Sequence, residues 1–210
     1  MMEYDYLMKI IFVGAPCVGK TSLLCNYCNK HHDGKYTPTI GVDFHATYHK
    51  INNKTVKCHM WDTAGQEQFK CIIQSYYKSV AAAVCLFDVS RPDTLDAAKE
   101  WIETVKSSTN APHVPVLLVA NKIDLAHGMY LIAEARSYCV ENGYDFVETS
   151  VRKGTGLTCA METIVQKVYD ELIVPGIESP GVKDVHKDRE HALQQNGDAS
   201  TQSLRCCTIS

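Results

Sequence analysis

No run in this sequence approaches eighteen consecutive apolar residues, the length that a transmembrane helix needs. The first six residues are acidic and polar, whereas a secretory signal peptide needs a basic start and an apolar middle. The net charge is only −3, which gives no reason to expect nucleic acid as the main partner. We therefore expect a protein that is made and kept in the cytoplasm and has no nucleic-acid partner.

Cysteine pairs at zinc spacing are also missing, although the chain contains ten cysteines. Cys25 and Cys28 have the spacing of half a zinc site, but no second pair follows at a suitable distance. In a reducing compartment, scattered cysteines are small buried hydrophobic residues rather than disulfide partners. We therefore expect neither a zinc site nor disulfides from these residues.

A glycine-rich stretch follows the first apolar run, residues 6–13, and precedes a predicted helix over 20–29. It reads Gly14-Ala15-Pro16-Cys17-Val18-Gly19-Lys20-Thr21. Strand, loop ending in Gly-Lys-Thr, and helix form a P-loop, in which backbone N–H groups and the helix N-terminus surround a phosphate. The ammonium of Lys20 is suited to the terminal phosphates, and the hydroxyl of Thr21 is suited to Mg²⁺.

The remaining apolar pattern predicts an α/β fold. Residues 81–87 and 114–120 are continuously apolar, which is typical of strands buried on both faces of a parallel sheet. Between them, residues 92–105 have helical spacing, and Asp93 is expected to cap the helix. Strands alternating with helices predict a P-loop NTPase fold: a six-stranded, mostly parallel sheet with one antiparallel edge strand and helices on both faces.

The apolar periodicity stops at Pro175, where polar, glycine and proline residues begin to dominate. We therefore predict one domain over residues 1–174 and a disordered tail over 175–210.

Three further polar segments follow predicted strands, at the edge where such sheets bind ligands. Asp62 can hold Mg²⁺ through water, Gly65 can offer its N–H to a terminal phosphate, and Gln66 can orient an attacking water. In Asn121-Lys122-Ile123-Asp124, the carboxylate can accept from both the N1–H and the exocyclic amine of guanine. Adenine lacks this donor pair. In the third segment, Thr149-Ser150-Val151, a backbone N–H can meet the guanine carbonyl.

These motifs resemble those of the Ras superfamily of small GTPases over about residues 6–172. Within it, Ile40-Gly41-Val42-Asp43-Phe44, residues 61–67 and Tyr76-Tyr77-Lys78 are similar to the Rab family. The resemblance implies a divergent Rab-type GTPase that binds GTP and GDP with Mg²⁺, hydrolyses GTP and switches effector binding in vesicle traffic. Phe44, Trp61 and Tyr76 match an aromatic triad that reads the loop state in Rab proteins, although three core aromatic residues would give the same pattern.

The resemblance also assigns site residues. The residues expected to bind GTP are Gly14, Ala15, Pro16, Cys17, Val18, Gly19, Lys20, Thr21, Ser22, His32, Thr39, Gly65, Asn121, Lys122, Asp124, Ser150, Val151 and Arg152. Mg²⁺ would be held by Thr21, Thr39 and Asp62. Catalysis would rest on Gln66, Lys20 and Thr39. No arginine lies in the loops where an internal catalytic arginine is expected, so a GTPase-activating protein would supply one to a slow enzyme.

Four positions depart from the family pattern: Pro16, Cys17, His32 and the segment Ser150-Val151-Arg152. Pro16 replaces a glycine or serine, removes an N–H and stiffens the loop, so we expect altered stimulation by activating proteins. His32 stands where an aromatic residue usually stacks on guanine. Because of Pro16, a GTP-binding module with little hydrolysis is an alternative. A P-loop kinase of another class is a second alternative, but the guanine motif and the missing arginine-rich lid argue against it.

The chain ends in a sequence that permits prenylation of Cys207, and Rab proteins carry lipids on paired cysteines such as Cys206 and Cys207. Because basic and acidic residues nearly cancel in the tail, stable anchoring would need both lipids. Expected partners are effectors at loops 31–44 and 64–78, an exchange factor, an activating protein, a prenyl-transfer escort and a GDP-dissociation inhibitor. We expect a monomer in the cytoplasm and on the cytoplasmic face of an intracellular membrane.

Overall fold

The computed structural model describes residues 3–28, 39, 41–64, 77–111, 113–125 and 129–187. The strands are β1 (Tyr6–Val13), β2 (Val42–Ile51), β3 (Lys54–Thr63), β4 (Ala82–Asp88), β5 (Val116–Asn121), β6 (Asp145–Glu148) and β7 (Val182–Asp184). The helices are α1 (Lys20–Tyr27), α3 (Asp93–Ser108), α4 (Met129–Asn142) and α5 (Leu157–Val168), which continues into a π-helical turn, Tyr169–Ile173.

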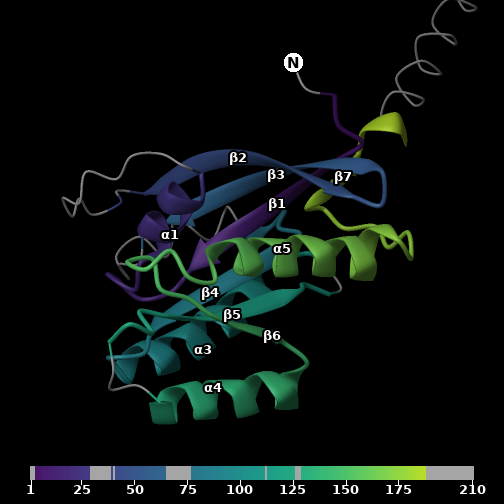
Figure 1. Cartoon of the computed structure of the whole chain (residues 1–210). Helices are drawn as coiled ribbons and strands as arrows, with labels where there is room; N and C mark the ends of the chain where they lie inside the picture. The colour runs from purple at the N-terminus through teal and green to yellow at the C-terminus, as the bar shows by residue number, and fades with distance from the viewer. Residues whose placement is uncertain are drawn as a thin grey trace, which may run out of the picture.

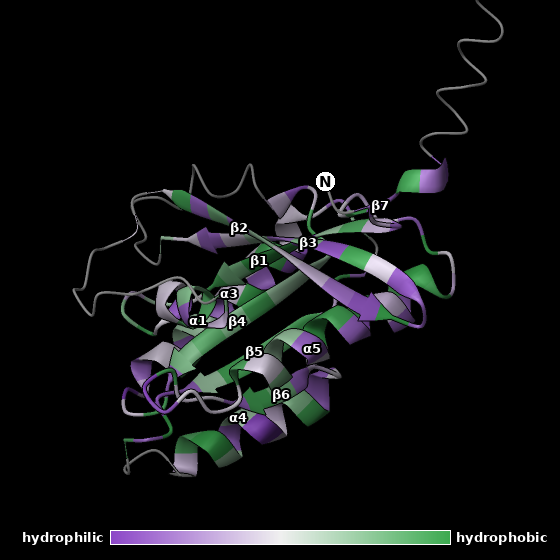
Figure 2. Ribbon diagram, turned by 45° about the horizontal axis from the view of Figure 1, so that its top comes forward, coloured by the Kyte–Doolittle hydropathy of each residue, from purple (hydrophilic) through white to green (hydrophobic). Residues whose placement is uncertain are grey.

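The main sheet has the order β2-β3-β1-β4-β5-β6, and its neighbours pair in parallel except for the antiparallel β2–β3 hairpin (Figure 1). The predicted α/β fold, with one antiparallel edge strand, is confirmed for these six strands. Every residue of β4 and β5 is buried, which explains why both sequences are continuously apolar. Figure 2 shows this contrast, with hydrophobic central strands beside a mixed β2–β3 hairpin.

Two hydrophobic cores cover the two faces of the sheet. On β1, Met8, Ile10 and Phe12 point into the core shared with α1 and α5, whereas Ile11 and Val13 point toward α3 and α4. This alternation is the period-2 pattern of a strand buried on both faces. Among the described residues, no helix combines the length and the apolar character that a membrane span requires.

The start of α3 differs from the prediction. Asp93 is the first residue of the helix and not its cap, and no side chain caps this end through a hydrogen bond. Its carboxylate instead accepts a hydrogen bond from Arg91 Nη2 at 2.7 Å. The Asp93 carboxylate therefore pairs with the arginine two residues earlier rather than with N–H groups at the start of the helix.

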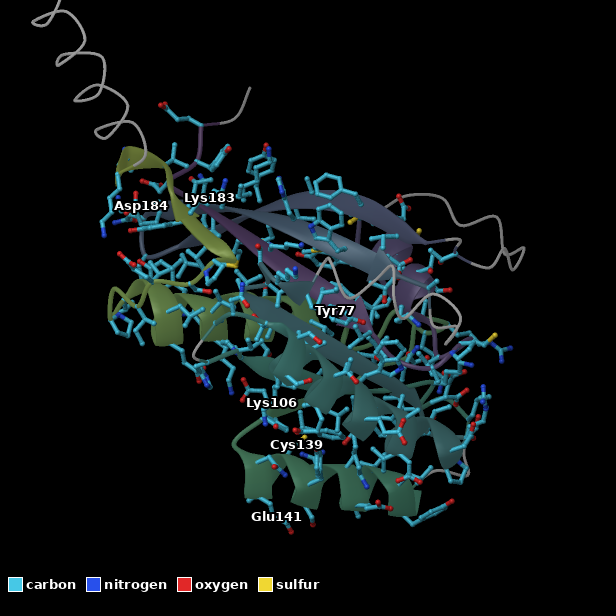
Figure 3. All side chains as sticks on the ribbon, turned by 180° about the vertical axis from the view of Figure 1, so that it is seen from behind. Tyr77, Lys106, Cys139, Glu141, Lys183 and Asp184 are labelled. Atoms are coloured by element: carbon cyan, nitrogen blue, oxygen red, sulfur yellow. The ribbon has the colours of Figure 1, made fainter. Side chains whose placement is uncertain are left out.

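The predicted tail boundary at residue 175 is wrong for residues 175–187, because this segment returns to the sheet. Strand β7 pairs antiparallel with the first half of β1, in a register that sets Met8 opposite Val182 and Tyr6 opposite Asp184. Figure 3 labels Lys183 and Asp184 on this strand (Figure 3). Strand β4 pairs only with the second half of β1, from Ile10 onward, so the first half has a free edge for β7. Residues 188–210 lie outside the described residues.

Hydrogen bonds fix both ends of this added segment. The Lys9 N–H donates to the Gly181 carbonyl at 2.9 Å, and the Val185 N–H donates to the Asp5 carbonyl at 3.0 Å. The Asp5 carboxylate contacts His186 Nε2 at 3.1 Å and accepts from the Thr55 N–H at 2.8 Å. The bond from Thr55, followed by that from Lys54, lowers the pKa of Asp5 to about 2. The segment is therefore held by main-chain pairing and by a charged side chain.

Gly181 provides a test of this docking. A Cβ at this residue would lie 2.0 Å from the Ala81 nitrogen and 2.1 Å from the Val80 carbonyl carbon, where only backbone could give way. We expect Gly181→Ala to release β7 and to lower the free energy of unfolding by about 1–3 kcal/mol, the usual effect of overpacking. Urea unfolding and limited proteolysis after residue 174 measure the two effects. Lys183→Ala, at an exposed position of β7, is the matched control; equal stability of both variants would contradict the docking.

Candidate functional site

The predicted P-loop lies at the carboxyl end of β1, between that strand and α1. At its first residue, Gly14 has a φ of +140°, and an added Cβ would lie 2.3 Å from the Leu86 carbonyl oxygen on β4. Only glycine fits this close approach. Cys17 has a φ of +63° without being glycine, a conformation that side chains rarely adopt. The loop thus has a tightly specified backbone even where its sequence is unusual.

Lys20 is buried inside this loop. The side chain has 6% of its surface exposed, and its Nζ donates to the carbonyls of Gly14 at 2.8 Å and Ala15 at 3.1 Å. Burial lowers the pKa of Lys20 to about 8, against the opposing influence of Asp62 and Cys17. A buried ammonium with so little counter-charge is stabilised by an anion, which a triphosphate would supply.

The three residues predicted to hold Mg²⁺ come together beside Lys20. The Thr21 and Thr39 hydroxyl oxygens are 2.8 Å apart, and Thr21 Oγ1 donates to Asp62 Oδ2 at 2.5 Å. Asp62 is fully buried, which raises its pKa, and its Oδ1 is a buried oxygen without a hydrogen-bond partner among the described residues. Two hydroxyls and one carboxylate are hard oxygen ligands, and Mg²⁺ characteristically completes such a set with water and phosphate. The residues therefore fit this ion.

The guanine motif is held against the P-loop by its first two residues. Asn121 donates from Nδ2 to the Val18 carbonyl at 2.7 Å, and Lys122 Nζ donates to the Cys17 carbonyl at 2.8 Å. The motif ends β5 and the P-loop ends β1, so the parallel sheet brings their carboxyl ends to the same edge. These bonds join the segments for phosphate and base into one site.

Asp124 faces the third predicted segment. The Ser150 hydroxyl donates to Asp124 Oδ1 at 2.6 Å, and this bond lowers the pKa of the carboxyl. An ionised carboxylate can only accept hydrogen bonds, which suits the two donors on guanine. Ser150 thus positions Asp124 in the form that the base requires.

Two supporting side chains were given no role by the sequence analysis. Asp88, at the end of β4, is buried and holds Lys122 Nζ at 2.7 Å. Thr149 donates from its buried hydroxyl to Asn121 Oδ1 at 3.0 Å and so fixes the amide's orientation. The signal for Asp88 was available, because it is a carboxylate directly after a buried apolar run.

The structure also brings an arginine to the P-loop, from a loop to which the sequence analysis gave no role. Arg91, between β4 and α3, points its Nη1 at the Pro16 carbonyl, 3.4 Å away. The two residues are 75 positions apart in the chain, and the acceptor is a backbone atom. No sequence motif marks such a contact.

The other predicted nucleotide residues vary in exposure. Ala15 is buried, Pro16 and Arg152 are exposed, and Ser22 and Val151 are half-buried, the latter packing beside the core under α5. His32, Gly65, Gln66, Cys206 and Cys207 lie outside the described residues. The same holds for most of the predicted partner loops, 31–44 and 64–78, of which 39, 41–44, 64, 77 and 78 are described. Among the described residues, no group of three histidines, cysteines or carboxylates could form a separate metal centre.

Two members of the predicted aromatic triad meet on the β2–β3 hairpin. The Phe44 and Trp61 rings pack edge to face with centroids 5.4 Å apart, and Lys9 Nζ lies 4.7 Å from the centre of the Trp61 ring. Phe44 has 41% of its surface exposed, so it is not a core residue. The core interpretation is therefore wrong for Phe44, while Tyr76 lies outside the described residues.

Comparisons of the sequence with known proteins identify the family. The family model described as "Ras family" matches residues 9–170. The Ras-related protein RABA2a of Arabidopsis thaliana is 33% identical over 168 residues, which cover 80% of this chain and 77% of the relative. The Ras-related protein RABA1b of the same plant is 30% identical over 208 residues, covering 98% and 96%. With a phosphate loop, a Mg²⁺ ligand set and a guanine motif at one sheet edge, this chain is a divergent Rab-family member of the Ras family of small GTPases.

Proposed function

We propose that the protein binds GTP and GDP with Mg²⁺, hydrolyses GTP, and uses the bound nucleotide to switch partner binding in membrane traffic. The observation that carries the proposal is the convergence of Lys20, the Thr21–Asp62 pair and Asp124 at one edge of the sheet. In a guanine-nucleotide site, a cation binds the phosphates, hard oxygen ligands bind Mg²⁺, and a carboxylate selects guanine.

Each group has a distinct task at this site. Lys20 and the P-loop N–H groups neutralise the phosphates, and Asp124 with Ser150 selects the base. Thr21, Thr39 and Asp62 would hold Mg²⁺, which would supply positive charge to the phosphate oxygens. We assign Gln66 the task of orienting the attacking water, because a neutral amide can donate and accept without changing charge. Positioning and electrostatic stabilisation are the main sources of catalysis for phosphoryl transfer.

Competition binding and single-turnover hydrolysis test this function. We expect the purified protein to prefer GTP over ATP by at least about a hundredfold, given two charge-assisted hydrogen bonds to guanine alone. Gln66→Leu should bind GTP equally well and hydrolyse it at least about ten times more slowly, because the water loses its orienting group. Equal uptake of ATP and GTP would contradict the proposal. Binding of GTP without any hydrolysis would favour the binding-only module, which family membership does not favour.

For the membrane, we propose that Cys206 and Cys207 both carry prenyl groups and place the protein on the cytoplasmic face of an intracellular membrane. The support is the cysteine pair in the sequence and the Rab relationship. Effectors would bind near Phe44, which is exposed and packs on the half-buried Trp61. An exchange factor, an activating protein, a prenyl-transfer escort and a GDP-dissociation inhibitor would act on a monomeric switch. Mass spectrometry of the native protein tests the lipids, with two expected and none contradicting the proposal.

A further inference from the structure

Arg91 is a charged residue beside the phosphate site that belongs to none of the nucleotide motifs. Its backbone is firmly held: the N–H donates to the Asp88 carbonyl at 2.9 Å, and the carbonyl accepts from Thr94 Oγ1 at 2.6 Å. Thr94 is fully buried and also accepts from the Asp88 N–H through its hydroxyl. The base of the Arg91 side chain is therefore anchored to the end of β4, next to the P-loop.

The guanidinium end is held much less tightly. Nη1 lies 3.4 Å from the Pro16 carbonyl oxygen, a long hydrogen bond, and Nη2 donates to Asp93 at 2.7 Å. The Arg91 side chain has 43% of its surface exposed, and that of Asp93 has 65%. Exposed ion pairs contribute little to stability, so this pair is easily exchanged for a stronger anion. A guanidinium has five N–H donors in a planar fork that matches phosphate oxygens.

The neighbours of Arg91 indicate what it does. Five consecutive P-loop carbonyls, from residue 14 to residue 18, each accept a hydrogen bond from a side chain. The donors, in order, are Lys20 for Gly14 and Ala15, Arg91 for Pro16, Lys122 for Cys17 and Asn121 for Val18. Lys20, Lys122 and Asn121 all belong to nucleotide motifs, and Arg91 completes the same row. Among these donors, Arg91 is the one attached outside the motifs, on a long and exposed side chain.

We propose that Arg91 turns from the Pro16 carbonyl to the triphosphate of bound GTP and acts as an internal arginine for hydrolysis. During the reaction, the water oxygen bonds to the γ-phosphorus, and the proton that the water loses passes to an oxygen of the γ-phosphate. The bond from that phosphorus to the bridging oxygen breaks, and its electron pair stays on the β-phosphate oxygen. Arg91 exchanges no proton and stabilises the negative charge that grows on these oxygens. The inference rests on the proposed GTPase function and replaces the expectation that only an activating protein supplies an arginine.

Four variants test this role. Arg91→Ala removes the charge, Arg91→Lys keeps a charge without the fork, and Asp93→Asn weakens the competing ion pair. Arg136→Ala on α4 is the matched control, because Arg136 is also exposed and paired with a carboxylate, that of Glu148, but makes no contact with the P-loop. The readouts are single-turnover GTP hydrolysis without an activating protein, the GDP release rate, and binding of aluminium fluoride to the GDP form. Aluminium fluoride mimics the planar phosphoryl group, and an enzyme that stabilises the transition state binds such mimics tightly.

We expect the parent protein to bind aluminium fluoride on its own. Arg91→Ala should lose this binding and hydrolyse GTP about ten- to a hundredfold more slowly, with the GDP release rate changed less than about twofold. Arg91→Lys should fall between the two, Asp93→Asn should match or exceed the parent rate, and Arg136→Ala should equal the parent.

Two results would overturn the role of Arg91 and leave the proposed GTPase function intact. Unchanged hydrolysis and fluoride binding in Arg91→Ala would remove it from the reaction. A GDP release rate that rises as much as hydrolysis falls would show that Arg91 merely braces the loop through Pro16. A parent protein that neither binds nor hydrolyses GTP would overturn the proposed function and this inference together.

Discussion

Asp124→Asn is expected to lower the affinity for guanine nucleotides by about a hundred- to a thousandfold and to raise that for xanthine nucleotides. A carboxylate at this position can accept from both donors on guanine, whereas an amide presents one acceptor and one donor. The amide donor would face the exocyclic amine of guanine, which is also a donor, while xanthine has a carbonyl at that position. The variant thus loses a charge-assisted hydrogen bond and sets two donors against each other, which accounts for the expected loss of affinity.

Competition of fluorescent nucleotides with guanosine, xanthosine and adenosine diphosphates measures this change. Asp96→Asn on α3 is a suitable control, because it alters the same charge at an exposed position away from the site. Because Ser150 donates to Asp124 through its hydroxyl, it can also donate to the amide oxygen of the variant, so the loop should keep its structure. An Asp124→Asn protein that still prefers guanine would show that another group reads the base.

The second large effect is expected for Lys20→Met, which should weaken nucleotide binding but should not destabilise the nucleotide-free protein. Nucleotide affinity should fall by about a thousandfold or more, because the variant loses the buried charge opposite the terminal phosphates. The nucleotide-free protein, in contrast, should be as stable as the parent or gain up to about 3 kcal/mol. Burial lowers the pKa of Lys20 from 10.5 to about 8, and one pKa unit corresponds to about 1.4 kcal/mol. The apolar methionine removes this cost.

Chemical unfolding of the nucleotide-free proteins and titration with GDP measure the two changes. Lys9→Met on β1 is a control for removing a partly buried lysine away from the P-loop. A Lys20→Met protein that loses more than about 1 kcal/mol would indicate that the bonds to Gly14 and Ala15 outweigh the cost of burying the charge.

The pH dependence of the parent protein follows from the same lysine. The unfolded chain keeps its Lys20 proton up to about pH 10.5, whereas the folded, nucleotide-free protein loses it near pH 8. Between these values the unfolded state binds more protons, so this group makes the folded protein more stable as the pH rises. Nucleotide binding favours the charged form, so affinity should fall as the pH rises above about 8. Lys20→Met should lack both slopes.

Much of this fold and site could be predicted from the sequence because the determining patterns are local. The continuously apolar residues of β4 and β5 are buried on both faces, as expected of central strands. The motifs for phosphate and guanine each follow a strand, and the parallel order of those strands brings them together. Even the short Asp124–Ser150 contact is consistent with two motifs at neighbouring strand ends.

The features that could not be predicted depend on long-range contacts without a pattern. Strand β7 has three residues, too few to show alternation, and it forms because half of β1 lacks a neighbour. Gly181 looked like a residue of a disordered tail, and only the nearby Val80–Ala81 backbone explains it. At the P-loop, Arg91 contacts a backbone carbonyl rather than a side chain, so residue types do not reveal this contact.

The docking of β7 determines where a lipid-carrying tail would leave the domain. Strand β1 runs toward the P-loop and β7 runs antiparallel to it, so the chain leaves the sheet at the end opposite the nucleotide. Because the thirteen residues 175–187 pack onto the domain, the chain that could connect the domain to a lipid is shorter by about 45 Å of extended length. The eighteen residues 188–205 would then join a lipid at Cys206 to the end of the sheet that lies away from the nucleotide, in place of the thirty-one residues from 175 to 205.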